Sequence, residues 1–433
     1  MNAEDFKYDF AVIGLGYVGL PLLAAAYSSG LDVLGVDASE GYLKALKDAD
    51  SEIHGIGVDV LQGLNSGLNS LASSPDNLGQ ARAIAVCVPT PVDADLSPDL
   101  SYVVRAAEAI SASLRPGQLV ILESTVAPGT TGGIFRATLE SGSDLIAGED
   151  FFLAYSPERI DPGNMKYGLK NTPKIVGGID EASTREAKNL YERFVDVVVL
   201  AKGAAEAEAA KLLENTYRHI NIALVNEFAV ACRSLGIDVF DVIRLAETKP
   251  FGFAKFSPSA GAGGHCIPVD PNYFSDALKM RTGSGLRFID LANSVNRAMP
   301  EVFASMTLEA VRETDSAKPK SVLVMGLTYK ADISDCRESP AFTLIDSLLS
   351  EGVDVMIHDP HVRIEALKEV HKRLFVANVE SQIETATAIV LLQMHKAYNE
   401  VLPLLQLHRD KVVSPLPPSV VDARFGFRSH GQV

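Results

Sequence analysis

Short apolar runs alternate with helical patterns along the first half of the chain. The run at residues 10–13 leads through glycines into a helical pattern that includes Leu22, Leu23 and Ala26. Continuous apolar runs separated by helices are typical of parallel strands buried on both faces. The other strand-like runs lie at residues 32–36, 83–88, 119–122, 151–155, 174–178 and 195–200, with a helix expected at 182–194. The pattern predicts a doubly wound α/β domain that ends near residue 200.

A long helical segment follows. No proline interrupts residues 204–235, and glycines stand at both ends, at Gly203 and Gly236. A helix of this kind would be about 45 Å long at 1.5 Å per residue, too long for one face of a small domain. We expect it to bridge two domains or to pack against its counterpart in a dimer. Further helical sequence is expected at residues 238–248 and, after a glycine-rich interruption, up to Val311.

A second alternation of strands and helices begins after Pro319. It predicts strands at residues 321–326, 353–357, 388–392 and 412–413, and a helix at 341–350. A further apolar pair stands near the end, at residues 420–421. This is the pattern of a second doubly wound domain.

A glycine motif joins the first strand to the first helix. Its residues include Gly14, Gly16, Tyr17, Val18 and Gly19. Asp37 ends the second strand, 18 residues after Gly19 and 23 after Gly14. Glycines permit the tight turn and close approach of a pyrophosphate, and the acid accepts from a ribose 2′-hydroxyl. We predict an NAD site, because the acid disfavours the 2′-phosphate of NADP. The second domain lacks this motif, so we expect it to hold another nucleotide.

Polar residues follow several of the predicted strands of the first domain. Pro89 and Thr90 follow one strand, Thr125 follows the next, and Glu158 and Arg159 lie in a proline-bounded loop after a third. Ligands of doubly wound sheets lie beyond the carboxyl ends of the strands, so these residues are site candidates. The alternatives are that the threonines cap helices and that the loop is a solvated turn.

Composition narrows the class of protein. The chain has 433 residues, which favours two or three domains, and its net charge of −16 disfavours nucleic acid and anionic membrane as partners. No run is long enough to span a bilayer, and no signal peptide is visible in residues 1–9, so a cytoplasmic protein is expected. The four cysteines, Cys87, Cys232, Cys266 and Cys336, are spread without metal-ligand spacing. We therefore expect free thiols and no metal site.

One cysteine stands apart because it lies in a glycine-rich loop, residues 261–271. Glycines let backbone approach a ligand closely, and Asp270 follows Cys266 by four residues. A reactive thiolate needs a nearby cation, and Lys211 of the long helix could supply one. Asn215 lies one turn after Lys211. Each feature also has a purely structural alternative. Cys266 could be a buried cysteine in a turn, and Lys211 and Asn215 could belong to a polar surface of the helix that continues through Arg218 and His219.

With these residues in place, the chain resembles the UDP-glucose/GDP-mannose dehydrogenase family over essentially its whole length. The resemblance rests on the motifs at residues 211–218, 249–253 and 263–270. It implies two Rossmann-like domains joined by a long helix that forms the core of a homodimer. The implied regions are an NAD-binding domain (1–203), a helical dimerisation region with the cysteine loop (204–317) and a UDP-sugar-binding domain (318–433).

The resemblance also implies a role for each matching residue. Cys266 would be the nucleophile and Lys211 the group that stabilises oxyanions, supported by Asn215 and Asp270. Thr125 and Glu158 would position water and protons. The remaining implied contacts are Lys330 to the sugar ring, Arg337 to the cofactor, and Arg159, Arg218 and Gly263 to the substrate. An ion pair of Arg337 with Asp335 or Glu338 is the alternative for that residue.

The implied reaction is an NAD-dependent, four-electron oxidation of a UDP-sugar at C6 through a cysteine thiohemiacetal and thioester. The motifs resemble those of bacterial UDP-N-acetylglucosamine 6-dehydrogenases that feed O-antigen and capsule synthesis. UDP-N-acetylmannosamine, UDP-N-acetylgalactosamine and UDP-glucose are the alternative substrates. A nucleotide-sugar sensor and a two-electron dehydrogenase are alternatives of other classes. The chain departs from many relatives at Ser259-Ala260 and at Gln393-Met394, which leaves the sugar open.

Overall fold

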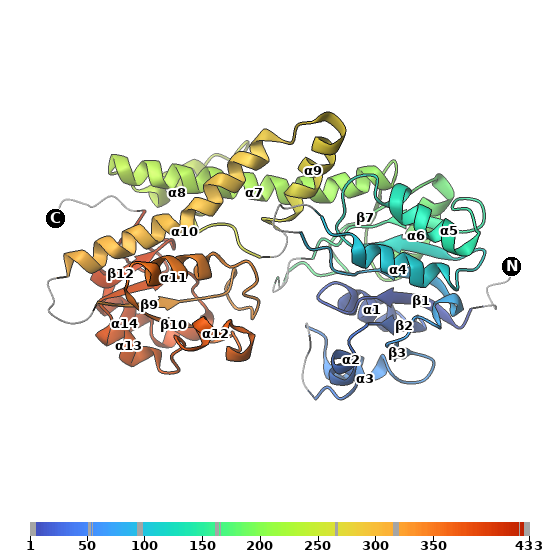
Figure 1. Ribbon diagram of the computed structural model, residues 1–433, viewed down its shortest axis with the longest axis horizontal. Coiled ribbons are helices and arrows are strands. Elements are labelled where there is room, and N and C mark those ends of the chain that lie inside the picture. Colours follow the sequence, from blue (N-terminus) through green and yellow to red (C-terminus); the bar gives the residue numbers. More distant parts are fainter. Residues whose placement is uncertain are drawn as a thin grey trace. The chain divides into compact units, whose positions relative to one another are not determined.

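The computed structural model describes residues 6–50, 53, 55–92, 98–160, 164, 166–264, 267–314, 320–423 and 425–427. The chain divides into two compact units (Figure 1). Unit 1 consists of Met1–Glu214 with Asn272–Ser284, and unit 2 of Asn215–Pro271 with Gly285–Val433.

Unit 1 is built on an eight-stranded sheet of described residues, in the order β3-β2-β1-β4-β5-β6-β7-β8. Every neighbouring pair is parallel except β6 with β7. The strands are β1 (Tyr8–Ile13), β2 (Val33–Val36), β3 (Ser70–Ala72), β4 (Ala81–Val86), β5 (Leu119–Leu122), β6 (Phe152–Tyr155), β7 (Lys174–Gly178) and β8 (Val198–Leu200). The predicted doubly wound α/β fold is confirmed. The short strand β3 and the antiparallel pair were not predicted.

Helices cover both faces of this sheet because alternate residues of each strand point to opposite sides. In β1, Phe10 and Val12 pack with α1, α2, α3 and α6, whereas Ala11 between them packs with α4 and α5. These helices are α1 (Gly19–Ser28), α2 (Glu40–Lys47), α3 (Val58–Gly63), α4 (Ser101–Ser111), α5 (Arg136–Ser143) and α6 (Glu181–Tyr191). The strands are therefore buried on both faces, as their continuous apolar runs predicted.

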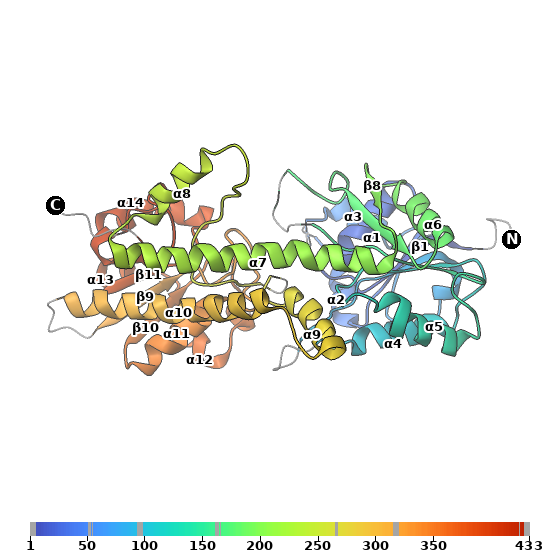
Figure 2. The same cartoon turned by 90° about the horizontal axis from the view of Figure 1, so that it is seen from above.

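The long helix α7 runs from Ala204 to Leu235, 32 residues, as the sequence predicted (Figure 2). The residue after the helix is Gly236, whose φ of +68° suits glycine, and the N–H of Ile237 donates back to the carbonyl of Cys232. Asp238 then caps the next helix by accepting from two backbone N–H groups. The later helices of this region are α8 (Val239–Glu247), α9 (Asp270–Thr282) and α10 (Arg287–Glu313).

Unit 2 contains a five-stranded sheet of described residues, all parallel, in the order β10-β9-β11-β12-β13. The strands are β9 (Ser321–Met325), β10 (Asp354–His358), β11 (Ala388–Leu391), β12 (Val412–Ser414) and β13 (Phe425–Gly426). Helices α10 and α11 (Pro340–Ser350) pack on one face, and α13 (Val379–Thr385) and α14 (Leu402–Leu407) pack on the other. A short helix α12 spans Glu369–Lys372. The apolar pair at 420–421 lies outside the strands, and β13 is the last strand within the described part of the chain.

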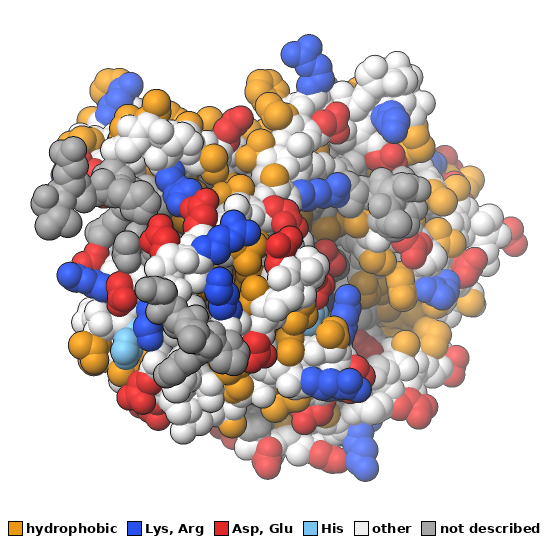
Figure 3. Space-filling view, turned by 60° about the vertical axis from the view of Figure 1, so that its left-hand side comes forward, with side chains coloured by type: hydrophobic (Ala, Val, Ile, Leu, Met, Phe, Trp, Pro, Cys, Tyr) orange, Lys and Arg blue, Asp and Glu red, His pale blue; other side chains and the backbone are white. Residues whose placement is uncertain are grey.

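The face of the molecule drawn in Figure 3 shows no continuous basic track. On the face drawn in Figure 3, Lys and Arg side chains are scattered among Asp and Glu. Among the described residues, no helix has both the length and the apolar character needed to cross a membrane.

Candidate active site

The glycine turn of unit 1 is fixed by steric limits. Gly14 has a φ of +86°, and a Cβ there would lie 2.6 Å from the carbonyl oxygen of Cys87. A Cβ on Gly19 would lie 1.8 Å from the carbonyl oxygen of Gly14. At Gly16, in contrast, an added Cβ meets no described atom within 4 Å. The first and third glycines therefore serve the fold, while the second leaves room for a ligand beside the backbone.

Asp37 lies against this turn from the end of β2. One carboxylate oxygen accepts the N–H of Leu15 at 2.9 Å, and the other accepts the N–H of Ser39 at 2.9 Å. The hydroxyl of Tyr42 donates to the carbonyl of Leu15 at 2.9 Å. The acid is thus held beside the glycine turn, where the nucleotide fingerprint requires it. Tyr17, within the turn, is exposed.

The candidate residues at the next strand ends do not cap helices. Thr90 follows β4 together with Pro89, is buried, and accepts a hydrogen bond at its carbonyl from Tyr273. Helix α4 has Leu100 at its N-cap instead. Thr125 follows β5, and the next helical turn has Thr130 at its N-cap. The capping alternative therefore fails for both threonines, and their contact with the cofactor stays a prediction.

The loop after β6 holds Glu158 in a defined position. One carboxylate oxygen accepts the N–H groups of Arg159 at 2.6 Å and Ile160 at 2.5 Å. The other, Oε2, is buried, lies 3.8 Å from the ammonium of Lys174, and has no hydrogen bond within the described structure. A buried carboxylate oxygen without a donor is suited to bind a water molecule. The role of Glu158 in positioning water stays a prediction.

Behind Glu158 lies a buried ion pair that the sequence did not predict. Lys174 donates to Glu123 at 2.5 Å and to the carbonyl of Pro157 at 3.3 Å. Tyr191 donates to the other oxygen of Glu123. Burial acts to lower the pKa of Lys174, but Glu123 and Glu158 outweigh it and the pKa is raised. Lys174 is therefore a buried cation.

The charged groups around Lys174 also affect the pKa of Cys87. Burial and the nearby Glu123 raise the pKa of this thiol well above its usual range. A thiol of this kind stays protonated and is a poor nucleophile. The interpretation of Cys87 as a core residue agrees with this environment.

Helix α7 contributes charged groups near the end of unit 1. Arg159 makes a two-pronged ion pair with Glu214, at 2.6 and 3.2 Å, and donates to the carbonyl of Pro173 at 2.7 Å. Lys211, one turn before Glu214, is half-buried and makes no ion pair or hydrogen bond with a described residue. An ammonium group without a protein partner is available to a ligand.

In unit 2, α7 is tied to the end of the cysteine loop. Asn215 donates to Asp270 at 2.5 Å, and both side chains are buried. Asp270 is the first residue of α9. Arg218 is exposed, whereas His219 is buried and bonds Asn293 at 2.9 Å, and burial lowers the pKa of His219. His265 and Cys266 lie outside the described residues, so the nucleophile stays a prediction.

The glycines before the cysteine pack against a neighbouring loop. A Cβ on Gly263 would lie 2.8 Å from the Cβ of Tyr329, the residue before Lys330. Arg337 donates to both carboxylate oxygens of Asp335 at 2.6 to 3.1 Å. This ion pair is one of the two alternatives that the sequence left open for Arg337, and its cofactor contact stays a prediction.

Comparison with known families decides the class of protein. Residues 8–195 match the NAD binding domain of the UDP-glucose/GDP-mannose dehydrogenase family, residues 205–298 match its central domain, and residues 323–425 match its UDP binding domain. The chain belongs to this family. NAD is accordingly the cofactor of unit 1, and the glycine turn and Asp37 fit it. The boundaries predicted for the three regions remain predictions.

Individual members of the dehydrogenase family resemble the chain over most of its length. A UDP-N-acetyl-D-mannosamine dehydrogenase of Pyrococcus horikoshii is 34% identical over 394 residues, 90% of each chain. An NDP-N-acetyl-D-galactosaminuronic acid dehydrogenase of Ralstonia solanacearum is 32% identical over 92% of each chain. The solved structure of the Pyrococcus horikoshii UDP-ManNAc dehydrogenase has a TM-score of 0.86 and 31% identity, covering 98% of this chain and 100% of that one.

Proposed function

We propose that this dehydrogenase oxidises a UDP-N-acetylhexosamine at C6 to the uronic acid, with NAD as the acceptor, and that UDP-N-acetylmannosamine is the first candidate substrate. The motifs favoured UDP-N-acetylglucosamine. Relatives named UDP-N-acetyl-D-mannosamine dehydrogenase include proteins of Pyrococcus horikoshii and Campylobacter jejuni, at 34% and 33% identity. We therefore rank UDP-N-acetylmannosamine above UDP-N-acetylglucosamine as the candidate substrate. The gluco and galacto sugars and UDP-glucose remain alternatives.

The observation that carries this proposal is the buried bond between Asn215 and Asp270, at 2.5 Å. It fastens the end of the cysteine loop to α7, one turn after Lys211. A simple two-electron dehydrogenase has no use for a cysteine four residues before an acid that is anchored in this way. Lys211 keeps an ammonium without an ion-pair partner among the described residues, which suits it to a developing oxyanion.

The proposed chemistry balances as one UDP-sugar, two NAD⁺ and one water giving the uronate, two NADH and three protons. NAD, when bound, accepts the two hydrides. The thiolate of Cys266 adds to the C6 aldehyde, and the resulting thiohemiacetal is oxidised to a thioester. Lys211 stabilises the negative oxygen of each tetrahedral species. A water held by Glu158 and Thr125 then hydrolyses the thioester.

The deciding experiment measures NADH formed per sugar, with the four UDP-sugars supplied separately to the purified protein. Two NADH from UDP-N-acetylmannosamine, with little turnover of the others, supports the full proposal. Two NADH from another of these sugars retains the reaction and changes the substrate. One NADH with accumulating aldehyde contradicts the thioester route, and no NADH from any sugar favours a nucleotide-sugar sensor.

We also propose that the protein is a homodimer through α7. Large apolar side chains of this helix are exposed at helical spacing, among them Tyr217, Leu224, Phe228 and Leu235. An exposed apolar stripe on a long helix is a typical protein interface. The cytoplasmic location and a role in surface polysaccharide synthesis are parts of the same proposal.

A further inference from the structure

A buried carboxylate organises the polar end of the sheet of unit 2. Asp359 follows β10, and its side chain is fully buried. One oxygen accepts the N–H groups of Leu327 at 2.7 Å and Thr328 at 3.2 Å. The same oxygen lies 3.0 Å from Nε2 of His395, which is also fully buried. Burial acts to raise the pKa of Asp359, but the bonds from His395 and the backbone lower it, so the acid is ionised.

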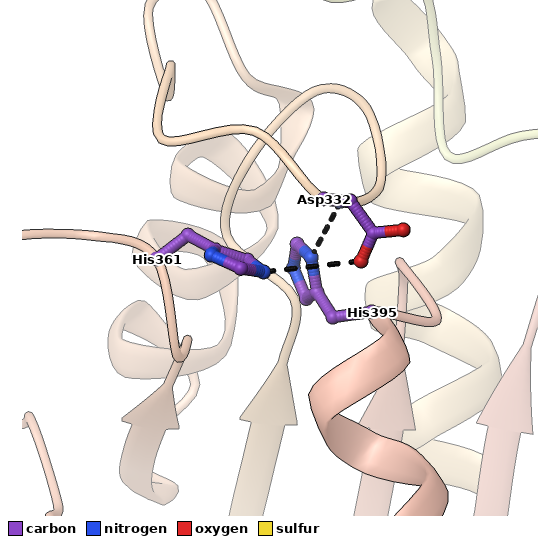
Figure 4. A group of neighbouring side chains, drawn as sticks. All are labelled: Asp332, His361 and His395. Atoms are coloured by element: carbon purple, nitrogen blue, oxygen red, sulfur yellow. Dashed lines mark hydrogen bonds and ion pairs between the residues drawn. The ribbon is translucent and has the colours of Figure 1, made fainter. Parts of the chain in front are cut away.

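His395 extends this anchor to a second point of the same loop. Its Nδ1 accepts the backbone N–H of Asp332 at 2.9 Å (Figure 4). Because Nδ1 is the acceptor, the ring proton lies on Nε2 and is donated to Asp359. Asp332 has a φ of +60°, which a residue with a Cβ adopts rarely, so this bond holds a strained backbone in place.

The segment between these anchors carries Tyr329, which packs against the cysteine loop, and Lys330, which the family resemblance assigns to the sugar. Tyr329 and Lys330 lie between Thr328 and Asp332, so both ends of their segment are fixed by the Asp359–His395 pair. Gln393 also fixes this segment, because its side-chain amide donates to the carbonyl of Tyr329 at 3.2 Å.

Tyr329 lies directly against the cysteine loop. A Cβ on Gly264 would come within 2.9 to 3.1 Å of three atoms of the tyrosine ring, and Gly264 has a φ of +86°. The ring therefore rests on bare backbone two residues before Cys266. Contact this close means that a shift of the ring would also shift the loop.

We propose that Asp359 and His395 are positioning residues for the reaction, acting through Tyr329 on the cysteine loop and through Lys330 on the sugar. This rests on the proposed function, which assigns the nucleophile to Cys266. The Asp359–His395 pair acts indirectly. It fixes residues 328–332, the segment that carries Tyr329 and Lys330.

A metal site is the competing interpretation of the same residues. Asp332, His361 and His395 offer ligand atoms within 4.8 Å of one another (Figure 4). However, both ring nitrogens of His395 are engaged, one as the acceptor from Asp332 and the other as the donor to Asp359. A metal needs a free lone pair on the imidazole. Coordination by His395 would therefore require the loop anchor to break.

The test measures the alkylation rate of Cys266 by iodoacetamide, read on the Cys266 peptide by mass spectrometry, together with kcat and the affinity for UDP. The variants are His395→Gln, His395→Asn and Tyr329→Ala. Asparagine places an oxygen near Nδ1 and can keep the bond from Asp332, whereas glutamine places its amide near Nε2 and loses it. The matched control is His371→Gln, a buried histidine of the same unit paired with Asp346 at 3.0 Å.

We expect His395→Gln and Tyr329→Ala to change the alkylation rate and to lower kcat by roughly tenfold to a hundredfold, with UDP affinity within about twofold. His395→Asn is expected to lose less, and His371→Gln to lose neither property. Unchanged alkylation in folded Tyr329→Ala and His395→Gln overturns the inference. So does calorimetric binding of Zn²⁺ to the wild type that His361→Ala abolishes.

This outcome is separable from the proposed function. If the wild type oxidises none of the four sugars, the proposed function fails, yet the alkylation rates still compare the variants. If His395→Gln does not fold, Tyr329→Ala decides the question alone, since its ring can be removed without disturbing the Asp359–His395 pair.

Discussion

At the scale of single residues, the cysteines differ in their surroundings. Cys87 is buried beside Glu123, which with burial raises the pKa of the thiol, and Cys232 lies in the core of unit 2. Cys266 alone follows a run of glycines and precedes an anchored acid. The physical requirements of a nucleophile therefore favour this one thiol.

Replacement of Cys266 by alanine is expected to lower kcat for NADH formation by about a thousandfold or more, because the covalent route is removed. Affinity for UDP should change by less than about twofold. Steady-state kinetics and UDP titration measure both effects, with Cys232→Ala as the control. Normal turnover in Cys266→Ala would favour the two-electron alternative.

Lys174 should be a major determinant of the stability of unit 1. Lys174→Met leaves Glu123 buried without its cation, which is expected to cost about 3–5 kcal/mol in the free energy of unfolding. Urea denaturation measures this cost. The double variant Lys174→Met/Glu123→Gln should recover part of the loss, and strict additivity of the two substitutions would contradict the coupling.

The ion pair also sets a pH dependence. The pKa of Lys174 is raised in the folded protein. Its contribution to stability is therefore complete below the unfolded pKa of about 10.4 and is lost as the pH rises through the folded value. Urea midpoints of wild type and Lys174→Met should converge at high alkaline pH, and a constant difference would speak against this assignment.

At the scale of elements, the strand-turn-helix unit at the N-terminus divides its glycines between fold and ligand. Gly14 cannot take a side chain without a clash with the carbonyl of Cys87, whereas Gly16 faces open space within the described structure. One substitution should therefore report on stability and the other on the cofactor.

Gly14→Ala is expected to lower the free energy of unfolding by at least about 1–2 kcal/mol, because its φ is positive. Gly16→Ala should leave stability within about 0.5 kcal/mol, yet weaken NAD binding by roughly tenfold, since its methyl group would occupy the place of the pyrophosphate. Denaturation curves and NAD titrations separate the two effects. Equal loss of stability in both variants would refute this division.

At the scale of the whole molecule, the exposed stripe of α7 predicts an assembly. Leu224 and Phe228 are 60% and 49% exposed in the single chain, which leaves them in water unless a partner covers them. We expect Leu224→Asp with Phe228→Asp to convert a dimer into a monomer. Light scattering after size-exclusion chromatography gives the mass. Leu407→Asp, at a 73% exposed position on α14, is the matched control and should stay dimeric.

Some features of this protein follow from the sequence alone because they depend on local patterns. The proline-free stretch between Gly203 and Gly236 indicated α7, short apolar runs indicated most of the strands, and the spacing of Gly14, Gly16 and Asp37 indicated the dinucleotide site. Strand β3 escaped prediction because three residues carry too little pattern to identify a strand.

Other features were decided only by tertiary structure. The buried pair of Lys174 and Glu123, and that of Asp359 and His395, join residues 51 and 36 positions apart. No periodicity links such residues, and each has an ordinary solvated alternative when the sequence is considered alone. Only the packing of the strand ends removes water from these groups, and that desolvation is what makes their pairing obligatory.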